Sequence, residues 1–305
     1  MMVSTTTTID FMAGLRGQLL VDEPMSKHTS WRVGGMADYF YTPFDKEDLI
    51  RLLHQLPADM PIYWIGLGSN LLVRDGGVSG LVLRTSKGLS QIRKVGADRV
   101  YAEAGVSCAK VAKTTVGFGL TGVEFLSGVP GTFGGAIAMN AGAFGGEIWP
   151  RIAKIDCVNR MGECLSFTNE DIKYGYREVD LPEDCWVIGG EIKLDHAEED
   201  TKGKQKIRSL LDKRGASQPI QSANAGSVFR NPQGGFAAKL IEECGLKGEA
   251  IGGARISHTH ANFIINENKA TAEDIESLID LIINRVAQQH NITLEPEVRV
   301  VGRPA

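Results

Sequence analysis

The sequence lacks the marks of several classes of protein. It has no C-x-x-C pair, and its five cysteines, an odd number, predict neither a disulfide framework nor a structural zinc site. Acidic residues outnumber basic ones, 37 against 33, without a long run of either charge, so we expect no nucleic-acid-binding face. Residues 1–17 lack a basic start and an apolar core, so we expect no signal peptide and a cytoplasmic location.

Glycine is the residue present in excess. The chain holds 36 glycines in 305 residues, and 18 of them fall between Gly66 and Gly146. The same segment contains a 22-residue run without a charge, Phe125 to Gly146. A run of this length suffices for a membrane span, but its seven glycines and Pro130 make a poor helix. We therefore expect no membrane span, and backbone that packs closely against another group, because glycine has no Cβ.

The spacing of apolar residues predicts helices and strands in irregular order, and therefore the α+β class. We expect helices over Asp45–Leu56, Ser107–Phe118 with Ser107 as its cap, Ile207–Arg214, Phe236–Cys244 ended by Gly245, and from Thr271, where T-A-E-D forms a capping box. We expect strands over Ile62–Ile65, Leu81–Leu83, Val100–Ala102, Ile152–Val158, Cys185–Leu194 and Val298–Val301, with a hairpin-like segment around Met161 and Gly162 joining the fourth and fifth.

A chain of 305 residues suits about two domains. The polar segment His196–Gln205 has no large apolar residue and predicts the boundary between them. We place the first domain at residues 1–200, divided near 95–105, and the second at 201–305. Oligomeric state is not fixed by these patterns, and a monomer is compatible with them.

The first glycine-rich motif, Gly66-Leu67-Gly68-Ser69-Asn70-Leu71, follows a predicted strand. It is not the dinucleotide fingerprint G-x-G-x-x-G, because its sixth residue is Leu71. Successive backbone N–H groups in such a turn form a nest for an anion such as a pyrophosphate. An ordinary glycine turn is the alternative.

A second glycine cluster runs from Gly128 to Gly142. Thr132 and Asn140 are its few polar side chains, and an uncharged backbone of this kind suits a flat, extended ligand. Small-residue packing in a structural core is the alternative. Two separate glycine segments in one domain favour a large cofactor.

An isolated serine, Ser227, lies in the turn-like segment Asn224–Pro232. Ala225 and Phe229 replace the two glycines of the hydrolase elbow G-x-S-x-G, so a nucleophilic triad is unsupported. A structural serine in a turn is the alternative.

The remaining candidates are charged residues and histidines. Arg177 presents a fork that can bind a carboxylate, and Glu297 stands at the start of a strand, where a surface role is the alternative. His258 and His260 have no H-E-x-x-H context or carboxylate cluster, so we expect no metal site.

The order of six segments along the chain is distinctive: GLGSNLLV, SGVPGTFGGAIAMNAGAFGGE, YGYR, NAGSVFRNP, AAKLIEECGLKGEAIGGARISHTHANFIIN and LEPEVRVVG. Together they closely resemble the bacterial UDP-N-acetylenolpyruvoylglucosamine reductases, from about Thr29 to Gly302. The segment GLGSN alone is shared by the wider flavoprotein superfamily that is similar to vanillyl-alcohol oxidase.

This resemblance implies an FAD-binding domain of the vanillyl-alcohol-oxidase-like type, made of two α+β subdomains, and a C-terminal α+β substrate domain. It implies non-covalent FAD and NADPH as the hydride donor. The implied reaction reduces the enolpyruvyl ether of UDP-N-acetylglucosamine to UDP-N-acetylmuramate, a step of peptidoglycan precursor synthesis that serves cell wall biogenesis, cell shape and division.

The resemblance also implies roles for individual residues. Ser227 would protonate the substrate carbon next to the carboxylate, assisted by Arg177 and Glu297. The implied substrate-binding residues are Asn231, Lys247 and His260, although His260 could equally be a core residue. The implied cofactor-binding residues are Gly66, Leu67, Gly68, Ser69, Asn70, Leu71, Val129, Pro130, Gly131, Thr132, Gly134, Gly135, Ala136, Asn140 and Gly142.

The chain departs from the pattern of the family in two respects. Members of the family often carry serine two residues after the YR arginine, where this chain has Val179. The chain also has no room for the inserted module with a tyrosine loop, so it resembles the shorter class, and the residues that close over the substrate are not identified.

The alternative functions are an FAD-dependent alcohol or sugar oxidase and a non-enzymatic protein that binds nucleotide sugars.

Overall fold

The computed structural model describes residues 12–305, so most of the segment in which we expect no signal peptide, residues 1–11, lies outside the described residues. The chain forms two compact units. The first contains the described residues up to Val21 together with Tyr39–Gly66 and Gly80–Gly203, and the second contains Asp22–Asp38, Leu67–Ser79 and Lys204–Ala305. Two short N-terminal segments thus belong with the C-terminal part of the chain. The division at 200/201 and near 95–105 stays a prediction of domain organisation.

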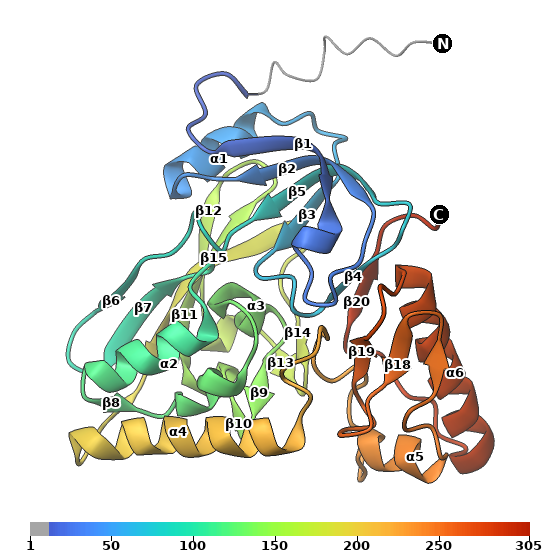
Figure 1. Ribbon diagram of the computed structural model, residues 1–305. Coiled ribbons are helices and arrows are strands. Elements are labelled where there is room, and N and C mark those ends of the chain that lie inside the picture. Colours follow the sequence, from blue (N-terminus) through green and yellow to red (C-terminus); the bar gives the residue numbers. More distant parts are fainter. Residues whose placement is uncertain (1–11) are drawn as a thin grey trace, which may run out of the picture. The chain divides into compact units, whose positions relative to one another are not determined.

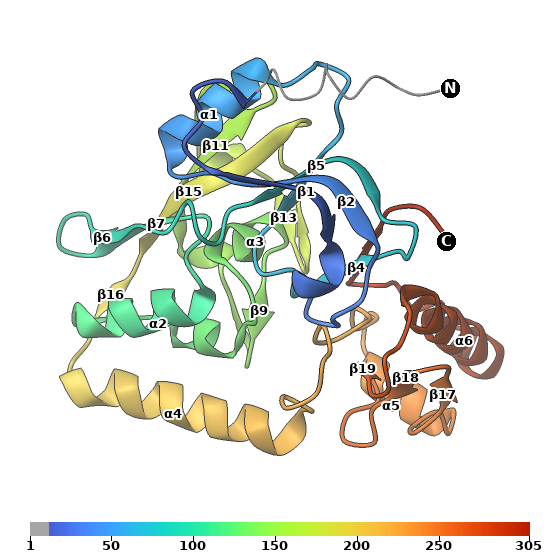
Figure 2. The same cartoon turned by 45° about the horizontal axis from the view of Figure 1, so that its top comes forward.

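The main sheet of the first unit is antiparallel, with the strand order β12-β11-β15-β7-β6. Its strands are β6 (Ile92–Lys94), β7 (Arg99–Glu103), β11 (Ile152–Asn159), β12 (Cys164–Thr168) and β15 (Cys185–Lys193). Helix α3 (Phe133–Ala138) packs against β7 and β15, and it lies beside this sheet in both views (Figures 1 and 2).

The chain has a second sheet and a number of shorter elements. A second sheet has the order β1-β2-β5-β3 and consists of β1 (Gln18–Pro24), β2 (Met36–Thr42), β3 (Ile62–Ile65) and β5 (Val78–Arg84). The other elements of the first unit are α1 (Lys46–Gln55), α2 (Cys108–Gly117), β8 (Leu120–Thr121), η3 (Glu124–Gly128), β9 (Gly142–Ala143), β10 (Gly146–Glu147), η4 (Trp149–Arg151), η5 (Asn169–Asp171), β13 (Tyr174–Gly175), β14 (Glu178–Val179) and β16 (Asp195–His196).

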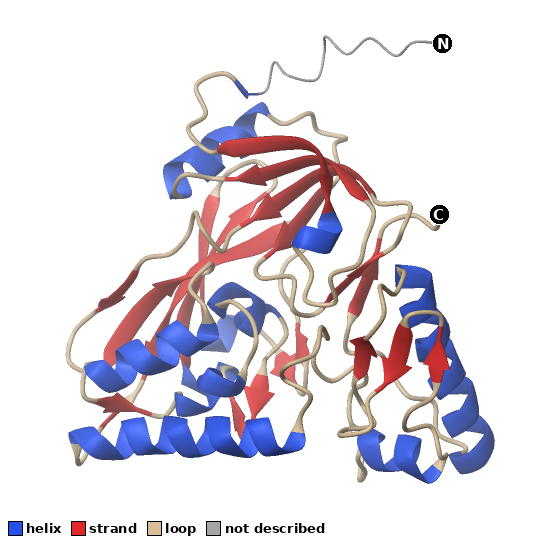
Figure 3. Cartoon of the chain, in the orientation of Figure 1, coloured by secondary structure: helices blue, strands red, loops and turns tan. Residues whose placement is uncertain are grey.

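The second unit packs a long helix on a small sheet. Its sheet has the order β17-β18-β19, and α6 packs on it (Figure 1). The elements of this unit are η2 (Met25–Lys27), β4 (Leu71–Val73), α5 (Ala237–Glu243), β17 (Ala250–Ile251), β18 (Ala254–Ile256), β19 (Ile264–Asn266), α6 (Ala272–His290) and β20 (Arg299–Val301). Figure 3 shows helices and strands mixed within each unit, so the α+β prediction is confirmed.

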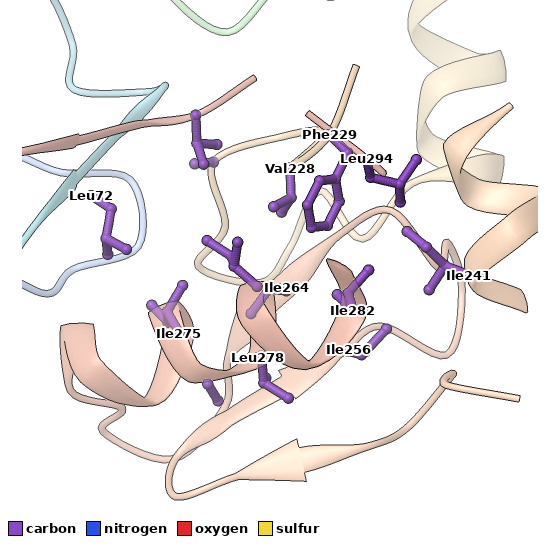
Figure 4. Close-up of a cluster of buried hydrophobic side chains, with 14 of the residues drawn as sticks. Leu72, Val228, Phe229, Ile241, Ile256, Ile264, Ile275, Leu278, Ile282 and Leu294 are labelled. Carbon is purple, nitrogen blue, oxygen red and sulfur yellow. The ribbon is translucent and has the colours of Figure 1, made fainter. Parts of the chain in front are cut away.

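One hydrophobic core holds the second unit together. Figure 4 shows Ile275, Leu278 and Ile282 of α6 in one buried cluster with Ile256 and Ile264 of the sheet. These five side chains are at most 1% exposed. The predicted spacing of the apolar residues of α6 is therefore confirmed, because these positions share one face of the helix.

Local capping explains where the predicted helices begin. The Ser107 side chain accepts a hydrogen bond from the N–H of Lys110, as predicted for the start of α2. At α6, Thr271 and Asp274 form the predicted capping box. Gly245, with φ +69°, follows the end of α5, as expected of a helix stop.

Two predictions about connections need correction. The hairpin at Met161 and Gly162 joins β11 to β12, a strand that the sequence did not reveal, and β15 then pairs on the other side of β11. The helix predicted over Ile207–Arg214 is longer at both ends: α4 (Asp200–Ser217) begins within the polar segment His196–Gln205. From residue 201 on, the first buried position of α4 is Gly203, where a Cβ would collide with the Val116 side chain, so no large apolar residue marks the helix there.

The uncharged run Phe125–Gly146 forms only short elements, namely most of η3, then α3, β9 and the start of β10. Within residues 12–305, no helix is both long and apolar enough to cross a bilayer. All five cysteines are free.

A parallel strand pair joins distant parts of the second unit. β4 pairs with β20 in the register Leu71 to Arg299 and Val73 to Val301. Just beyond β4, the Asp75 carboxylate accepts hydrogen bonds from the N–H groups of Ala272 and Glu273, each at 3.0 Å. The first turn of α6 is therefore capped both by its own Thr271 and by a residue almost 200 positions earlier.

Replacing Asp75 tests this second cap. We expect Asp75→Ala to lower the free energy of unfolding by about 1–2 kcal/mol, because two helix N–H groups lose their acceptor and a negative charge leaves the helix N-terminus. Urea unfolding of the purified protein measures the loss. Asp280→Ala, an exposed position in the same helix, is the matched control and should change stability by less than about 0.5 kcal/mol. Equal effects of both variants would contradict the capping role.

Candidate functional site

The first glycine motif begins in the first unit with Gly66 and continues in the second unit from Leu67. A Cβ on Gly66 would collide with the side chain of Thr132, and a Cβ on Gly68 would collide with the carbonyl oxygen of His28. Gly68 also has φ +62°, a conformation that glycine adopts without strain. Both glycines are therefore required by close backbone approach.

The turn of this motif leaves backbone donors available. Among residues 12–305, the N–H groups of Leu67, Gly68 and Ser69 have no hydrogen-bond acceptor. Successive unpaired N–H groups form a nest that binds an anion without a basic side chain. The turn therefore has three successive N–H groups that are able to bind a phosphate group, and its role in holding the cofactor stays a prediction.

Several polar groups of the second glycine segment already have hydrogen-bond partners within the protein. Thr132 is 2% exposed and caps α3, because its hydroxyl accepts the N–H of Gly135. The N–H groups of Phe133 and Gly134 donate to carbonyls of neighbouring backbone, at 2.7 and 2.9 Å. Pro130 and Gly135 are exposed. The segment thus has an uncharged surface of the kind that suits a flat ligand. Contact between this segment and the flavin stays a prediction.

Asn140 is fully buried and acts on the backbone around it. Its Nδ2 donates to the carbonyl of Gly175 (2.8 Å) and to the carboxylate of Glu147 (3.0 Å). Its Oδ1 accepts the N–H of Trp149 (3.2 Å). Its amide therefore serves the protein, and a role in cofactor binding stays a prediction.

Arg177 lies at the turn between β13 and β14 of the first unit. Its φ is +59°, a left-handed conformation that a residue other than glycine adopts at a cost of about 1–2 kcal/mol. The guanidinium donates to the carbonyls of Asn140 (3.3 Å) and Gly142 (2.8 Å) and lies 5.1 Å from the ring centroid of Tyr176. The predicted charged residue is thus held by backbone of the second glycine segment.

Ser227 and Glu297 are brought together in the second unit. The N–H of Glu297 donates to the carbonyl of Val228, the neighbour of Ser227, at 2.7 Å. The Nδ2 of Asn70 donates to the carbonyl of Glu297 at 3.0 Å. Ser227 is half-buried, and its hydroxyl has no hydrogen-bond partner among residues 12–305. A partly accessible, unpartnered hydroxyl is able to meet a ligand, unlike a serine that closes its own turn.

The predicted substrate-binding residues of the second unit include a pair that interacts through charge. Burial, and then the charge of Lys247, lower the pKa of His260, whereas the charge of Glu242 opposes the shift. The Nζ of Lys247 lies 2.9 Å from the Glu242 carboxylate. The His260 ring packs edge-on against Phe263, with 4.7 Å between ring centroids. The charge of Lys247 thus acts on the His260 imidazole.

The third predicted substrate contact, Asn231, is exposed, and its Oδ1 accepts the N–H of Ala237 at the start of α5. Its side chain therefore has a structural contact already. In the part of the chain that the structure describes, no group of three or more His, Cys, Asp or Glu side chains is placed to hold a metal ion.

Both the N-terminal and the C-terminal part of the chain match known protein families. Residues 37–168 match the FAD binding domain family, and residues 218–301 match the C-terminal domain of UDP-N-acetylenolpyruvoylglucosamine reductase. The UDP-N-acetylenolpyruvoylglucosamine reductase of Methylococcus capsulatus is 50% identical over 287 residues, covering 94% of each chain. That of Nitrosococcus oceani is 48% identical over 293 residues, covering 96% of this chain and 98% of the relative.

The chain belongs to the UDP-N-acetylenolpyruvoylglucosamine reductase family. A solved structure agrees: the crystal structure of UDP-N-acetylenolpyruvylglucosamine reductase from Thermus caldophilus superposes with a TM-score of 0.78 at 30% identity, over 94% of this chain and 99% of that one. A member of this family that carries an FAD-binding domain is a flavoprotein oxidoreductase. The relatives favour the reductase over the flavin oxidase that the GLGSN motif left open.

The sequence did not reveal what the two asparagines of the glycine segments contact. Asn70 and Asn140 were predicted with the cofactor-binding residues, but their side chains bind backbone at Glu297 and Gly175. The only signal in the sequence was their spacing beside glycines, which does not indicate the direction of a side chain. Their contacts depend on segments that lie 227 and 35 positions away in the chain.

Removing the Lys247 charge tests the proximity of Lys247 and His260. We expect Lys247→Met to raise the pKa of His260, because a positive neighbour is lost while the Glu242 carboxylate remains. An NMR titration of the imidazole protons, assigned with His260→Gln, measures the shift. Lys239→Met is the control, since Lys239 pairs with Glu243 on α5, and should leave the pKa unchanged. An unchanged or lowered pKa in Lys247→Met would rule out the interaction.

A double-mutant cycle tests the close approach of Gly66 to Thr132. We expect Gly66→Ala to lower the free energy of unfolding by roughly 1–3 kcal/mol, because the new methyl group meets the Thr132 side chain. Thr132→Ala alone should lose a helix cap, about 1 kcal/mol. The double variant should be more stable than the sum predicts by at least about 0.5 kcal/mol, because the colliding atoms are gone.

Denaturant unfolding of the FAD-loaded protein measures the cycle. Gly117→Ala is the matched control, since a Cβ there would meet no atom within 4 Å. Simple additivity of the two changes would show that the two glycine segments do not meet in this way.

Proposed function

We propose that this protein catalyses the NADPH-dependent reduction of the enolpyruvyl ether of UDP-N-acetylglucosamine to UDP-N-acetylmuramate, in peptidoglycan precursor synthesis. The observation that carries the proposal is the relationship to the reductases along nearly the whole chain, with Ser227, Arg177 and Glu297 all present. We propose the cytoplasm as its location, in keeping with five free cysteines.

When bound, FAD supplies the hydride chemistry that connects NADPH with the substrate. The Leu67–Ser69 turn would hold its pyrophosphate through backbone N–H groups. The second glycine segment would lie against the flavin, because it is uncharged and free of bulky side chains over much of its length. These residues bind and orient the cofactor and take no part in proton transfer.

The substrate needs a proton as well as a hydride. Hydride adds to one carbon of the enol ether double bond, and the neighbouring carbon, next to the carboxylate, gains carbanion character that a proton must neutralise. We assign this proton to the Ser227 hydroxyl, which has no partner among residues 12–305. A serine hydroxyl is a weak acid, so the developing charge on the substrate must be stabilised elsewhere.

Charged residues supply that stabilisation. We assign to Arg177 the binding of the substrate carboxylate as it gains enolate charge, since its guanidinium is suited to a two-point contact. We assign to Glu297 a hydrogen bond or a shared proton at the same oxygens. Lys247 would meet a phosphate or carboxylate of the substrate as a point charge, with Asn231 and His260 as further contacts.

Absorbance spectroscopy of the purified protein tests the function. We expect a yellow protein that NADPH bleaches and that regains its colour when the enolpyruvyl UDP-sugar is added without oxygen. We expect Ser227→Ala to keep bleaching by NADPH but to slow reoxidation by the UDP-sugar by roughly 10²–10⁴-fold, the range for loss of a general acid. Ser222→Ala, an exposed serine nearby, is the control.

The two half-reactions separate the possible failures. A protein that NADPH does not bleach, or that the UDP-sugar does not reoxidise, is not this reductase. Normal reoxidation of Ser227→Ala removes Ser227 from proton transfer and leaves the overall reaction in place.

A further inference from the structure

Two asparagines, one in each unit, share an arrangement that cofactor binding does not explain. Asn140 belongs to the second glycine segment and Asn70 to the first. Each directs its side-chain amide at the backbone of a segment that carries a proposed charged residue of the reaction, Arg177 for Asn140 and Glu297 for Asn70.

Asn140 holds the Arg177 hairpin at two points. Its Nδ2 donates to the carbonyl of Gly175, the last residue of β13, and its own carbonyl accepts a hydrogen bond from the Arg177 guanidinium. Its Nδ2 also donates to the Glu147 carboxylate (3.0 Å), and its Oδ1 accepts the N–H of Trp149 (3.2 Å). A fully buried amide with all these contacts has a restrained orientation. It therefore restrains the position of the turn that carries Arg177 relative to the second glycine segment.

This support is what the strained turn requires. Arg177 has φ +59°, and a residue in the left-handed region persists only where its surroundings impose that conformation. The short pair β13 and β14 provides only two paired positions of its own. The guanidinium is also held from outside the hairpin, by the carbonyls of Asn140 and Gly142.

Asn70 does the equivalent for Glu297. Its Nδ2 donates to the carbonyl of Glu297, and its carbonyl accepts the N–H of Arg299, both at 3.0 Å. These bonds hold Glu297 from the C-terminal side. From the other face, the N–H of Glu297 donates to Val228, next to Ser227.

The geometry points to Asn140 and Asn70 as positioning residues: Asn140 fixes Arg177, and Asn70 fixes Glu297, for the substrate half of the reaction. This inference rests on the proposed function, because it concerns the residues assigned to that half. It gives the two asparagines a task other than contact with the flavin.

The test of Asn140 uses Asn140→Gly. Asn140 has φ +44°, so glycine keeps the backbone conformation and the carbonyl that Arg177 binds, and only the amide is lost. We expect the FAD content and the rate of bleaching by NADPH to stay within about 3-fold of the wild type. Reoxidation by the UDP-sugar should slow by about 10–100-fold, the effect of a reacting group displaced by about 1 Å.

Action through Arg177 is tested in a second background. Arg177→Ala should slow reoxidation, and Asn140→Gly should have no further effect on it in Arg177→Ala, because the group that it positions is gone. Asn159→Ala is the control: this residue of the same unit accepts two backbone N–H groups at the β11–β12 hairpin, and its loss should leave both half-reactions unchanged.

The test of Asn70 combines Asn70→Ala with Glu297→Gln. We expect Asn70→Ala to slow reoxidation by the UDP-sugar in the wild-type background and to have no further effect on it in Glu297→Gln.

Each outcome has one meaning. Loss of FAD from Asn140→Gly or Asn70→Ala would make that asparagine a cofactor ligand and overturn its positioning role. Equal slowing in the wild-type and Arg177→Ala backgrounds would overturn it as well, since a general loss of structure affects both alike. If Arg177→Ala itself reoxidises normally, the inference for Asn140 falls while the reductase activity stands. If the wild type is not reoxidised, the proposed function fails first.

Discussion

The parallel pairing of β4 with β20 is the contact on which the second unit depends. It joins Leu71–Val73 to Arg299–Val301 across more than 220 residues of chain. Because both strands are fixed, Asn70 at the start of one reaches the carbonyl of Glu297 before the other. At the far end, the same pairing brings Asp75 to the first turn of α6. One short ladder thus sets the glycine turn, a proposed catalytic carboxylate and the main helix of the unit.

The sequence could predict what is local. Ser107 and Thr271 cap their helices as expected, because a cap needs only the next three residues. It could not predict that β4 pairs with β20, because a run of three apolar residues does not indicate which distant strand it pairs with. Helix α4 began earlier than predicted because its buried stripe starts with Gly203, which has no apolar side chain to count.

In the candidate site, too, the sequence predicts local features but not contacts between distant segments. The glycine segments and the order of motifs identified the residues to consider, and the match to the reductase family confirmed the cofactor and the class of enzyme. The direction of each side chain could not be predicted, because an asparagine beside glycines is equally able to face a ligand or the protein. The Asn140 amide is fully buried and has three protein partners, and its role in cofactor binding stays a prediction.

The excess of glycine therefore has two separate physical causes. At Gly66 and Gly134, a Cβ would strike a neighbouring segment, so glycine is needed for packing. At Gly68, close approach to His28 accompanies a turn whose N–H groups face no protein acceptor among the described residues. Only the second kind offers hydrogen bonds to a ligand. A glycine-rich segment consequently marks where backbone is close-packed, and unpaired N–H groups within it mark where an anion is able to bind.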